Sequence, residues 1–180
     1  MGQAKFKRRV AYHEAGHAVI ARVHDLDIVD IDLEAYRPEV KTSSATWTAL
    51  TADSDREGLL EALAVDVKIS LAGCAVDEIR KAPEIDAQQE DLHRALDGIC
   101  SMVAPDRLIA APQSVGQSFT PTVAEQAEIE IIRERLWQET VAEVRQHWDW
   151  IDRVAVLFIS RTRATQADVD AQNPMAPVAA

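Results

Sequence analysis

The chain has 180 residues, of which 47% are hydrophobic and 27% charged, and its formal net charge is −11. This length and composition are typical of one globular domain with a core of its own. The negative charge argues against a nucleic-acid backbone or an anionic membrane surface as a partner. We expect a single domain over residues 1–170 and a flexible tail over residues 171–180.

The sequence shows no secretory signal and no membrane-spanning stretch. Its basic start leads into a histidine-containing segment, and the longest apolar run, Val154–Ile159, is much shorter than the roughly 20 residues of a spanning helix. Cys74 and Cys100 lie in separate apolar contexts without ligand spacing, which is typical of free buried thiols in a reducing compartment. These features predict a cytoplasmic protein without membrane insertion.

The first predicted helix covers residues 4–24 and contains the motif His13-Glu-Ala-Gly-His17. Apolar residues recur around the motif at spacings of three and four, so both histidines face the interior. These apolar residues are Phe6, Val10, Ile20 and Val23. The basic residues at the start of the helix indicate a solvated first turn: Lys5, Lys7, Arg8 and Arg9. Gly16 would allow another segment to approach the helix closely.

Two histidines one helical turn apart can bind a single zinc ion from one side. Glu14 is rotated about 100° from His13, because a helix turns once in about 3.6 residues, so its carboxylate can act as a base beside the metal. Such histidines can also be hydrogen-bonded core residues, but the pair with a glutamate between them favours a metal site. One zinc ion per chain is expected, with a third protein ligand from elsewhere.

Two short strands are predicted next. Residues 27–35 and residues 44–51 both alternate in polarity, with residues 36–43 as the loop between them. Together they would form a small antiparallel sheet beside the first helix. The edge of the second strand could hold an extended substrate through backbone hydrogen bonds, although an ordinary solvent-facing edge is about equally compatible. The substrate-binding candidates on this edge are Thr46, Trp47 and Thr48.

The remaining elements are predicted to be helices. They cover residues 55–80, 86–103, 125–147 and 149–161, followed by a short helix after the capping box Thr165–Asp168. The first of them is apolar on nearly all sides, as a central helix is. Thr120 and Pro121 predict the start of the helix that includes residues 125–147. The predicted buried stripe of the helix over residues 86–103 consists of Leu92, Leu96, Ile99 and Val103. The fold expected is mainly α (α+β), with a small antiparallel sheet beside the active-site helix.

Spacing alone does not decide the third metal ligand. His24 lies two helical turns beyond the motif, about 10 Å away, which is too far to share the ion. His147 lies on the exposed part of a long helix. Three residues of the predicted helix over residues 86–103 remain nearly equivalent candidates for the third ligand: Glu90, Asp91 and His93.

Three motifs, in this order, resemble the peptidase domain of FtsH-type zinc metalloproteases: His13–His17, the small-residue segment Ser70–Glu78, and Glu90–Leu92. In that family a Gly-Gly-Arg-Ala-Ala-Glu-Glu type of motif precedes an Asn-Asp-Leu motif whose aspartate is the third zinc ligand. The resemblance therefore implies Asp91 as the third ligand and a helical, zincin-like peptidase fold. The similarity in motif order and helix layout covers about residues 5–170.

The sequence also departs from the family pattern. Ala72 stands where the family has glycine, Cys74 where it has arginine, and residues 45–48 lack the family's glycine-tyrosine pair. No GxxxxGK[ST] phosphate loop occurs in these residues, so the ATPase module that unfolds substrates in the family has no counterpart here. Under this resemblance the chain could cleave already unfolded peptides unaided or dock on a separate AAA-type ATPase, and a six-fold homo-oligomeric ring is suggested.

Motif and resemblance together imply a zinc metalloendopeptidase that acts on unfolded polypeptides, with Glu14 as the base that activates water. Asp77 and Glu78 could orient a histidine ligand, or could equally be surface carboxylates at a helix end. Two other functions stay open: a catalytically silent zinc-binding assembly or adaptor module, and a zinc hydrolase acting on a non-peptide amide. Glu14 argues against the adaptor, because a purely structural zinc site does not need it.

Overall fold

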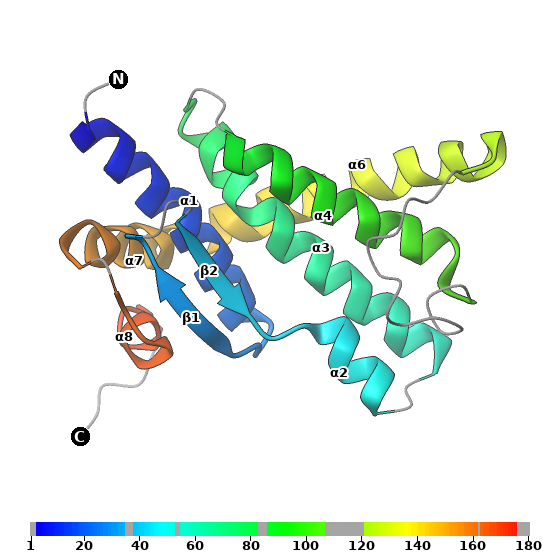
Figure 1. The fold of residues 1–180 in the computed structure, drawn as a ribbon, viewed down its shortest axis with the longest axis horizontal. Helices are drawn as coiled ribbons and strands as arrows, with labels where there is room; N and C mark the ends of the chain where they lie inside the picture. Colours follow the sequence, from blue (N-terminus) through cyan, green and yellow to red (C-terminus); the bar gives the residue numbers. More distant parts are fainter. Residues whose placement is uncertain are drawn as a thin grey trace.

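The structure is a computed structural model that describes residues 3–34, 38–52, 55–82, 86–106, 121–161 and 163–175. Among these residues it is mainly helical, with one small antiparallel sheet, as expected (Figure 1). The strands are β1 (Ile28–Asp32) and β2 (Glu39–Thr42). The helices are α1 (Gln3–Val23), α2 (Ala45–Thr51), α3 (Arg56–Ile79), α4 (Asp86–Val103), α6 (Val123–Gln146), α7 (Trp148–Ser160) and α8 (Gln166–Asp170).

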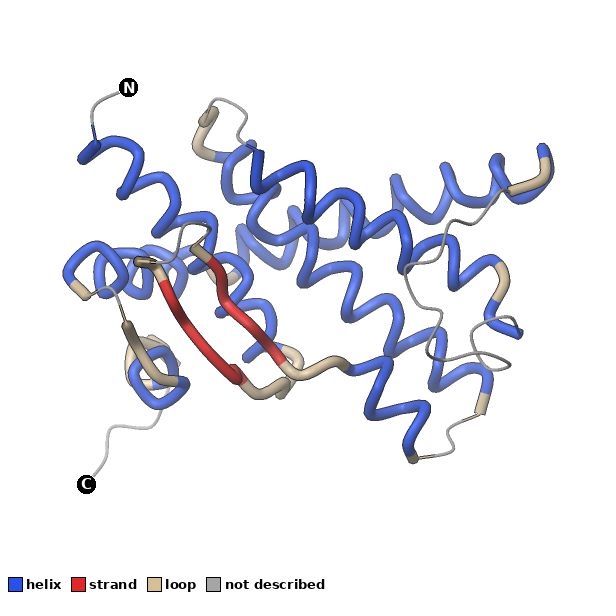
Figure 2. The backbone as a smooth tube through the Cα atoms, viewed as in Figure 1, coloured by secondary structure: helices blue, strands red, loops and turns tan. Residues whose placement is uncertain are grey.

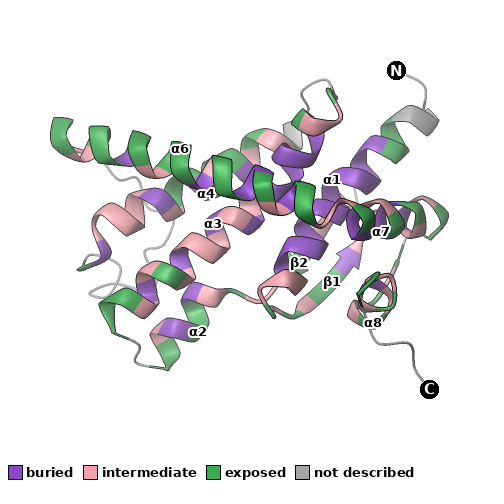
Figure 3. Cartoon of the chain, turned by 180° about the vertical axis from the view of Figure 1, so that it is seen from behind, coloured by how far each residue is buried: buried purple, intermediate pink, exposed green. Residues whose placement is uncertain are grey.

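Helix α3 is the central element, which confirms the prediction from its all-round apolar sequence. It packs against α1, α2, α4 and α6, and Figure 1 shows α4 running beside it. Each side of α3 contributes to a different apolar cluster: Val76 packs with α1 and α7, Leu71 with α4 and α6, and Leu63 with α2. Seen from behind, α1 is largely buried, whereas much of α6 faces outward (Figure 3).

The crossing of α1 over α3 depends on a glycine. A Cβ atom added at Gly16 would lie 2.8 Å from Val76 Cγ2 and 3.0 Å from the carbonyl oxygen of Ala72. The two helices therefore touch almost backbone to backbone, which matches the close approach expected at Gly16. This contact fixes the metal motif of α1 directly against α3.

The two strands lie side by side in an antiparallel pair (Figure 2). Within this pair, Ile31 is opposite Val40. The outer edge of β1 is partly covered by the C-terminal segment, since Asp32 forms a bridge with Arg163 and the Ile28 N–H donates to Gln166 Oε1. Strand β2 packs against α1. The outer edge of β2 therefore lies on the side of the motif helix, where the Val40 N–H donates to Glu14 Oε2.

The predicted strand over residues 44–51 is wrong, because this segment is helix α2. Ser44 caps the helix by accepting a hydrogen bond from the Trp47 N–H. The carboxylate of Asp66 on α3 accepts from the Ala45 and Thr46 N–H groups, so an anion from outside the segment satisfies the first turn. The second strand of the sheet lies instead within residues 36–43, the stretch predicted as a loop.

The predicted buried stripe of α4 is also wrong over its first half. Leu92 and Leu96 are 49% and 42% exposed, whereas Asp91, Ala95 and Ile99 are buried. These three residues are spaced by four, so the true inward face is rotated by one residue from the predicted one. The rotation turns Asp91 toward the core.

Two of the predicted helix starts can be compared with the structure. Helix α6 begins at Val123, two residues before the predicted range of 125–147. Its N-cap is Thr122, two residues after the predicted Thr120, and Thr122 forms a capping box with Glu125. Thr120 itself lies outside the described residues. The capping box of Thr165 and Asp168 at α8 is confirmed.

Both cysteines are free thiols, as predicted; Cys74 is buried and Cys100 is partly exposed. Within the described ranges, no helix is long and apolar enough to cross a membrane.

Candidate metal centre

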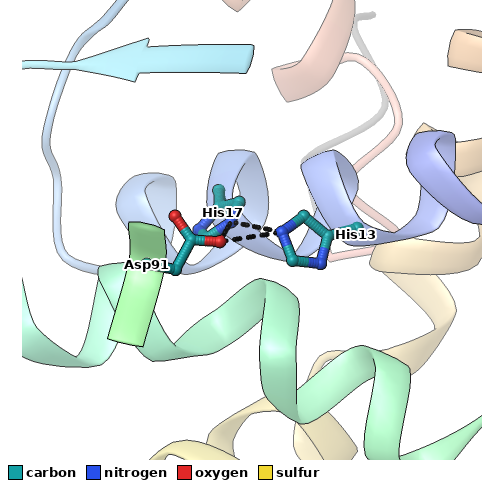
Figure 4. Close-up of side chains that lie close together, drawn as sticks. All are labelled: His13, His17 and Asp91. Atoms are coloured by element: carbon teal, nitrogen blue, oxygen red, sulfur yellow. Dashed lines mark hydrogen bonds and ion pairs between the residues drawn. The ribbon is translucent and has the colours of Figure 1, made fainter. Parts of the chain in front are cut away.

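Three side chains from two helices meet at one point in the interior (Figure 4). His13 and His17 come from α1 and Asp91 from α4, and they are 1%, 7% and 7% exposed. Their possible ligand atoms all lie within 4.8 Å of one another, close enough to hold a metal ion. In the part of the chain that the structure describes, this is the one such group of histidine, cysteine and acidic side chains.

The spacing of the ligand atoms fits a tetrahedral ion. His13 Nε2 lies 2.9 Å from Asp91 Oδ2 and 3.2 Å from His17 Nε2, and His17 Nε2 lies 3.3 Å from Asp91 Oδ2. Ligands about 2.0–2.1 Å from a tetrahedral zinc ion are separated from each other by about 3.3 Å. The three atoms therefore form one face of a coordination tetrahedron with little rearrangement, and a fourth position remains for a non-protein ligand.

Both imidazoles are held so that Nε2 points to the common centre. His13 Nδ1 lies 3.0 Å from Asp77 Oδ2, and His17 Nδ1 lies 2.7 Å from the carbonyl oxygen of Ile69. Because these oxygens accept hydrogen bonds, each Nδ1 carries the donated proton and leaves Nε2 available for a metal. This is the arrangement usual for ligating histidines, and it selects the same nitrogen in both rings.

Gly73 provides the floor of the centre. A Cβ atom at this position would lie 2.5 Å from His17 Nε2 and 2.6 Å from His13 Nε2. Any other residue at this point of α3 would place a carbon atom against the two ligand nitrogens. The glycine of the small-residue segment thus has a direct role in the site.

The charges of the site are strongly coupled. Burial alone would lower the pKa of His13, but its hydrogen bonds to Asp77 and Asp91 raise it to about 10. Burial would likewise lower the pKa of His17, and the Asp91 carboxylate raises it instead. Burial opposes ionisation of Asp91, yet the two histidines hold its pKa far below the usual range. The metal-free centre therefore attracts protons where a cation would bind.

Glu14 is 4% exposed and next to the ligand group. Its Oε2 accepts a hydrogen bond of 2.9 Å from the Val40 N–H of β2. Burial raises the pKa of this carboxyl, while the charges of His17 and His13 oppose that rise. The predicted base thus faces both the centre and the neighbouring strand.

The two candidate second-layer carboxylates have different positions. Asp77 is 1% exposed and contacts His13 directly. Burial would raise the pKa of Asp77, but hydrogen bonds from His13 and Arg9 lower it. Glu78 is exposed at the C-terminal end of α3, in line with the alternative of a surface carboxylate.

The histidines considered as third ligands lie elsewhere. His24 pairs with Glu143 at 3.0 Å, His93 is exposed on α4, and His147 lies at the junction of α6 and α7. The three residues proposed to bind substrate on a strand edge belong to α2, where Thr46 is buried and Trp47 is 59% exposed. An edge-strand role for them is excluded by that helix.

Sequence reasoning missed four groups around the site: the Arg9 and Gln88 side chains, the Ile69 carbonyl and the Gly73 backbone. Arg9 was assigned to a solvated turn, although it precedes His13 by the same four residues that separate the two histidines. That spacing was the available signal. A backbone carbonyl and a backbone surface leave no comparable mark in the sequence.

No protein-family model matches this chain, and no curated protein shows significant similarity to it. The interpretation of the centre therefore depends on its geometry and on the motifs themselves.

Proposed function

We propose that the protein is a zinc metallopeptidase with a zincin-like centre, similar to the peptidase domain of FtsH-type proteases. The observation that carries this proposal is the convergence of His13, His17 and Asp91, with both Nδ1 atoms anchored and Glu14 beside them. Nitrogen and carboxylate ligands in a three-residue set with a fourth position open are what catalytic zinc prefers. A purely structural zinc site is usually closed by four protein ligands.

The chain's own residues have distinct parts in this proposal. His13, His17 and Asp91 would hold the ion, which when bound supplies a Lewis acid and lowers the pKa of water. Glu14 would accept a proton at its carboxylate and return it to the leaving amine of the cleaved bond. Burial raises the pKa of the Glu14 carboxyl, which makes it a better proton acceptor.

The substrate in this proposal is an extended, unfolded polypeptide aligned along β2. The Val40 N–H points toward Glu14, so the outer edge of β2 faces the centre, while the outer edge of β1 is partly covered. A peptide added to that edge would gain backbone hydrogen bonds next to the metal ligands. Assembly into a homo-oligomeric ring and delivery of substrates by a separate AAA-type ATPase are further parts of the same proposal.

One observation favours the catalytically silent zinc module as the second candidate. Glu14 is buried and its carboxylate is engaged by a backbone N–H of β2, so in this conformation the base is shielded from solvent. A peptidase must expose Glu14 when substrate binds, whereas a structural module need not.

Cleavage of casein without ATP separates the two candidates. Zinc-loaded wild-type protein is compared with Glu14→Gln, which keeps the ligand set and removes the base. We expect wild type to cleave and Glu14→Gln to lose at least about a hundredfold in rate with unchanged zinc content. Zinc at one ion per chain with no cleavage of casein, or with equal cleavage by both proteins, would refute the proposed mechanism. A parallel screen of small amides tests for a non-peptide substrate.

A further inference from the structure

Arg9 is a buried cation directly behind the candidate metal centre. It lies on α1 one turn before His13, on the same face of the helix, and is 5% exposed. Its neighbour Arg8 is exposed. The first turns of α1 therefore contain one solvated arginine and one arginine that is fully enclosed by the fold.

Arg9 shares a single acceptor atom with His13. Asp77 Oδ2 lies 3.3 Å from Arg9 Nη2, 3.0 Å from His13 Nδ1 and 2.8 Å from Gln88 Nε2. These donors come from α1 and α4, and the acceptor comes from α3. The carboxylate that fixes the first histidine is thus itself held from two helices.

Burial of Arg9 costs free energy that the visible contacts only partly recover. Among the described residues its Nε and Nη1 groups and Asp77 Oδ1 are buried without a hydrogen-bond partner. A buried ion pair with unsatisfied groups contributes little or nothing to stability compared with an apolar pair of the same size. A role in the site explains the retained charge better than a role in folding alone.

The charges of the metal-bound state give Arg9 that role. A histidine binds a metal only through an unprotonated nitrogen, so His13 is neutral once it ligates. Asp77 then keeps one ion-pair partner within the described ranges, which is Arg9. Three buried carboxylates, Glu14, Asp77 and Asp91, surround the centre. A bound divalent ion would compensate two of these charges, and Arg9 would compensate the third.

We propose that Arg9 is a positioning residue for the metal centre: it holds the Asp77 carboxylate in place, so that Asp77 fixes the ring of His13 with Nε2 directed at the ion. This inference rests on the proposed zinc function, but it concerns metal binding and not hydrolysis. Arg9 itself contacts neither the ligand atoms nor a substrate in this role.

The test is a double-mutant cycle on metal affinity. Zinc affinity is measured by competition with a chromophoric chelator, and Co²⁺ absorption reports the ligand geometry. The variants are Arg9→Met, Asp77→Asn and the double variant, with Arg8→Met as the control that removes the same charge from the exposed neighbour. Thermal unfolding of each metal-free variant is recorded beside these measurements.

We expect Arg9→Met to weaken zinc binding by about tenfold or more and to change the Co²⁺ spectrum, since removal of groups behind a ligating histidine typically costs 10–100-fold in affinity. Arg8→Met should remain within about twofold of wild type. In the Asp77→Asn background, Arg9→Met should add less than about twofold, because both variants interrupt the same chain of contacts.

Two results would overturn the inference: wild-type affinity and spectrum for Arg9→Met, or an equal loss from Arg9→Met with and without Asp77. If Arg9→Met does not fold, Arg9→Gln replaces it with the same expected outcomes. A wild-type chain that binds no zinc would overturn the metal centre itself. A chain that binds zinc without cleaving casein would overturn only the peptidase proposal.

Discussion

Replacement of Gly73 by alanine is the most direct perturbation of the centre, because it adds one methyl group at a known place. The new Cβ would lie 2.5 Å from His17 Nε2 and 2.6 Å from His13 Nε2 and Cε1. Ordinary carbon–nitrogen contacts are roughly 1 Å longer. Neither ring can retreat easily, because Asp77 and the Ile69 carbonyl hold the opposite nitrogens.

Two contributions of opposite sign determine the change in the free energy of unfolding of the metal-free protein. Alanine in a helix interior gains about 1 kcal/mol over glycine, and overpacking costs about 1–3 kcal/mol. The metal-free Gly73→Ala protein should therefore lose at most about 2 kcal/mol of unfolding free energy. The metal-bound state loses much more, since the methyl group occupies the space beside the ligand nitrogens. Zinc at a hundred times the wild-type dissociation constant stabilises wild type by about 2.7 kcal/mol and should not stabilise the variant.

The assay is chemical unfolding with and without zinc, and Gly98→Ala is the matched control. Its added Cβ would lie 2.5 Å from Val67 Cγ2, at a helix contact between α3 and α4 that holds no ligand. The control should change stability while keeping the full increment from zinc. A Gly73→Ala protein that is stabilised by zinc as strongly as wild type would refute the assignment of Gly73 as the floor of the metal centre.

Two further predictions follow from the charges. Since the pKa of His13 in the metal-free protein is raised to about 10, this ring is protonated at neutral pH and must lose its proton to ligate. Zinc binding should therefore release protons at pH 7, and zinc affinity should increase as the pH rises toward about 10. Calorimetric titration in buffers of different ionisation enthalpy measures the proton release. Zinc binding without proton release would contradict this prediction. Glu143 on α6 pairs with His24, which follows the end of α1. Burial would raise the pKa of the Glu143 carboxyl, but its hydrogen bonds with Lys68 and His24 lower it. Because the folded pKa is the lower one, the stabilisation is present above the ordinary value of 4.5 and lost as the pH falls through the folded value. Glu143→Gln should therefore destabilise the protein by about 1 kcal/mol at neutral pH and by less in acid, as measured by urea unfolding; an equal loss at both pH values would show that the charge is not responsible.

The helices and the inward-facing histidine pair could be predicted because their signals are local. The period around His13 and His17 and the apolar run of α3 depend on residues close in sequence, and the resemblance selected Asp91 from three near-equivalent candidates. The prediction for residues 44–51 failed because the Asp66 carboxylate, from a different helix, decides the conformation of the first turn of α2. Alternating polarity could not reveal that contact.

The inward face of α4 could not be derived from hydrophobicity for a related reason. Leucines usually mark the buried side of a helix, but here the buried side carries an aspartate because the ligand group lies there. The prediction of a solvated Arg9 fails in the same way, because its charge indicates an exposed side chain although the residue is buried. Both errors occurred where the site requires polar groups in the interior.

The ligand set joins parts of the chain that are far apart in sequence. His13 and Asp91 are separated by 78 residues, and the segment between them includes the sheet and two helices. A bound ion would therefore act as a reversible cross-link between α1 and α4 that closes a long loop. Loss of the ion would remove this cross-link, while the packing of α4 on α3 and the glycine contact of α1 with α3 would still hold both helices on the central helix.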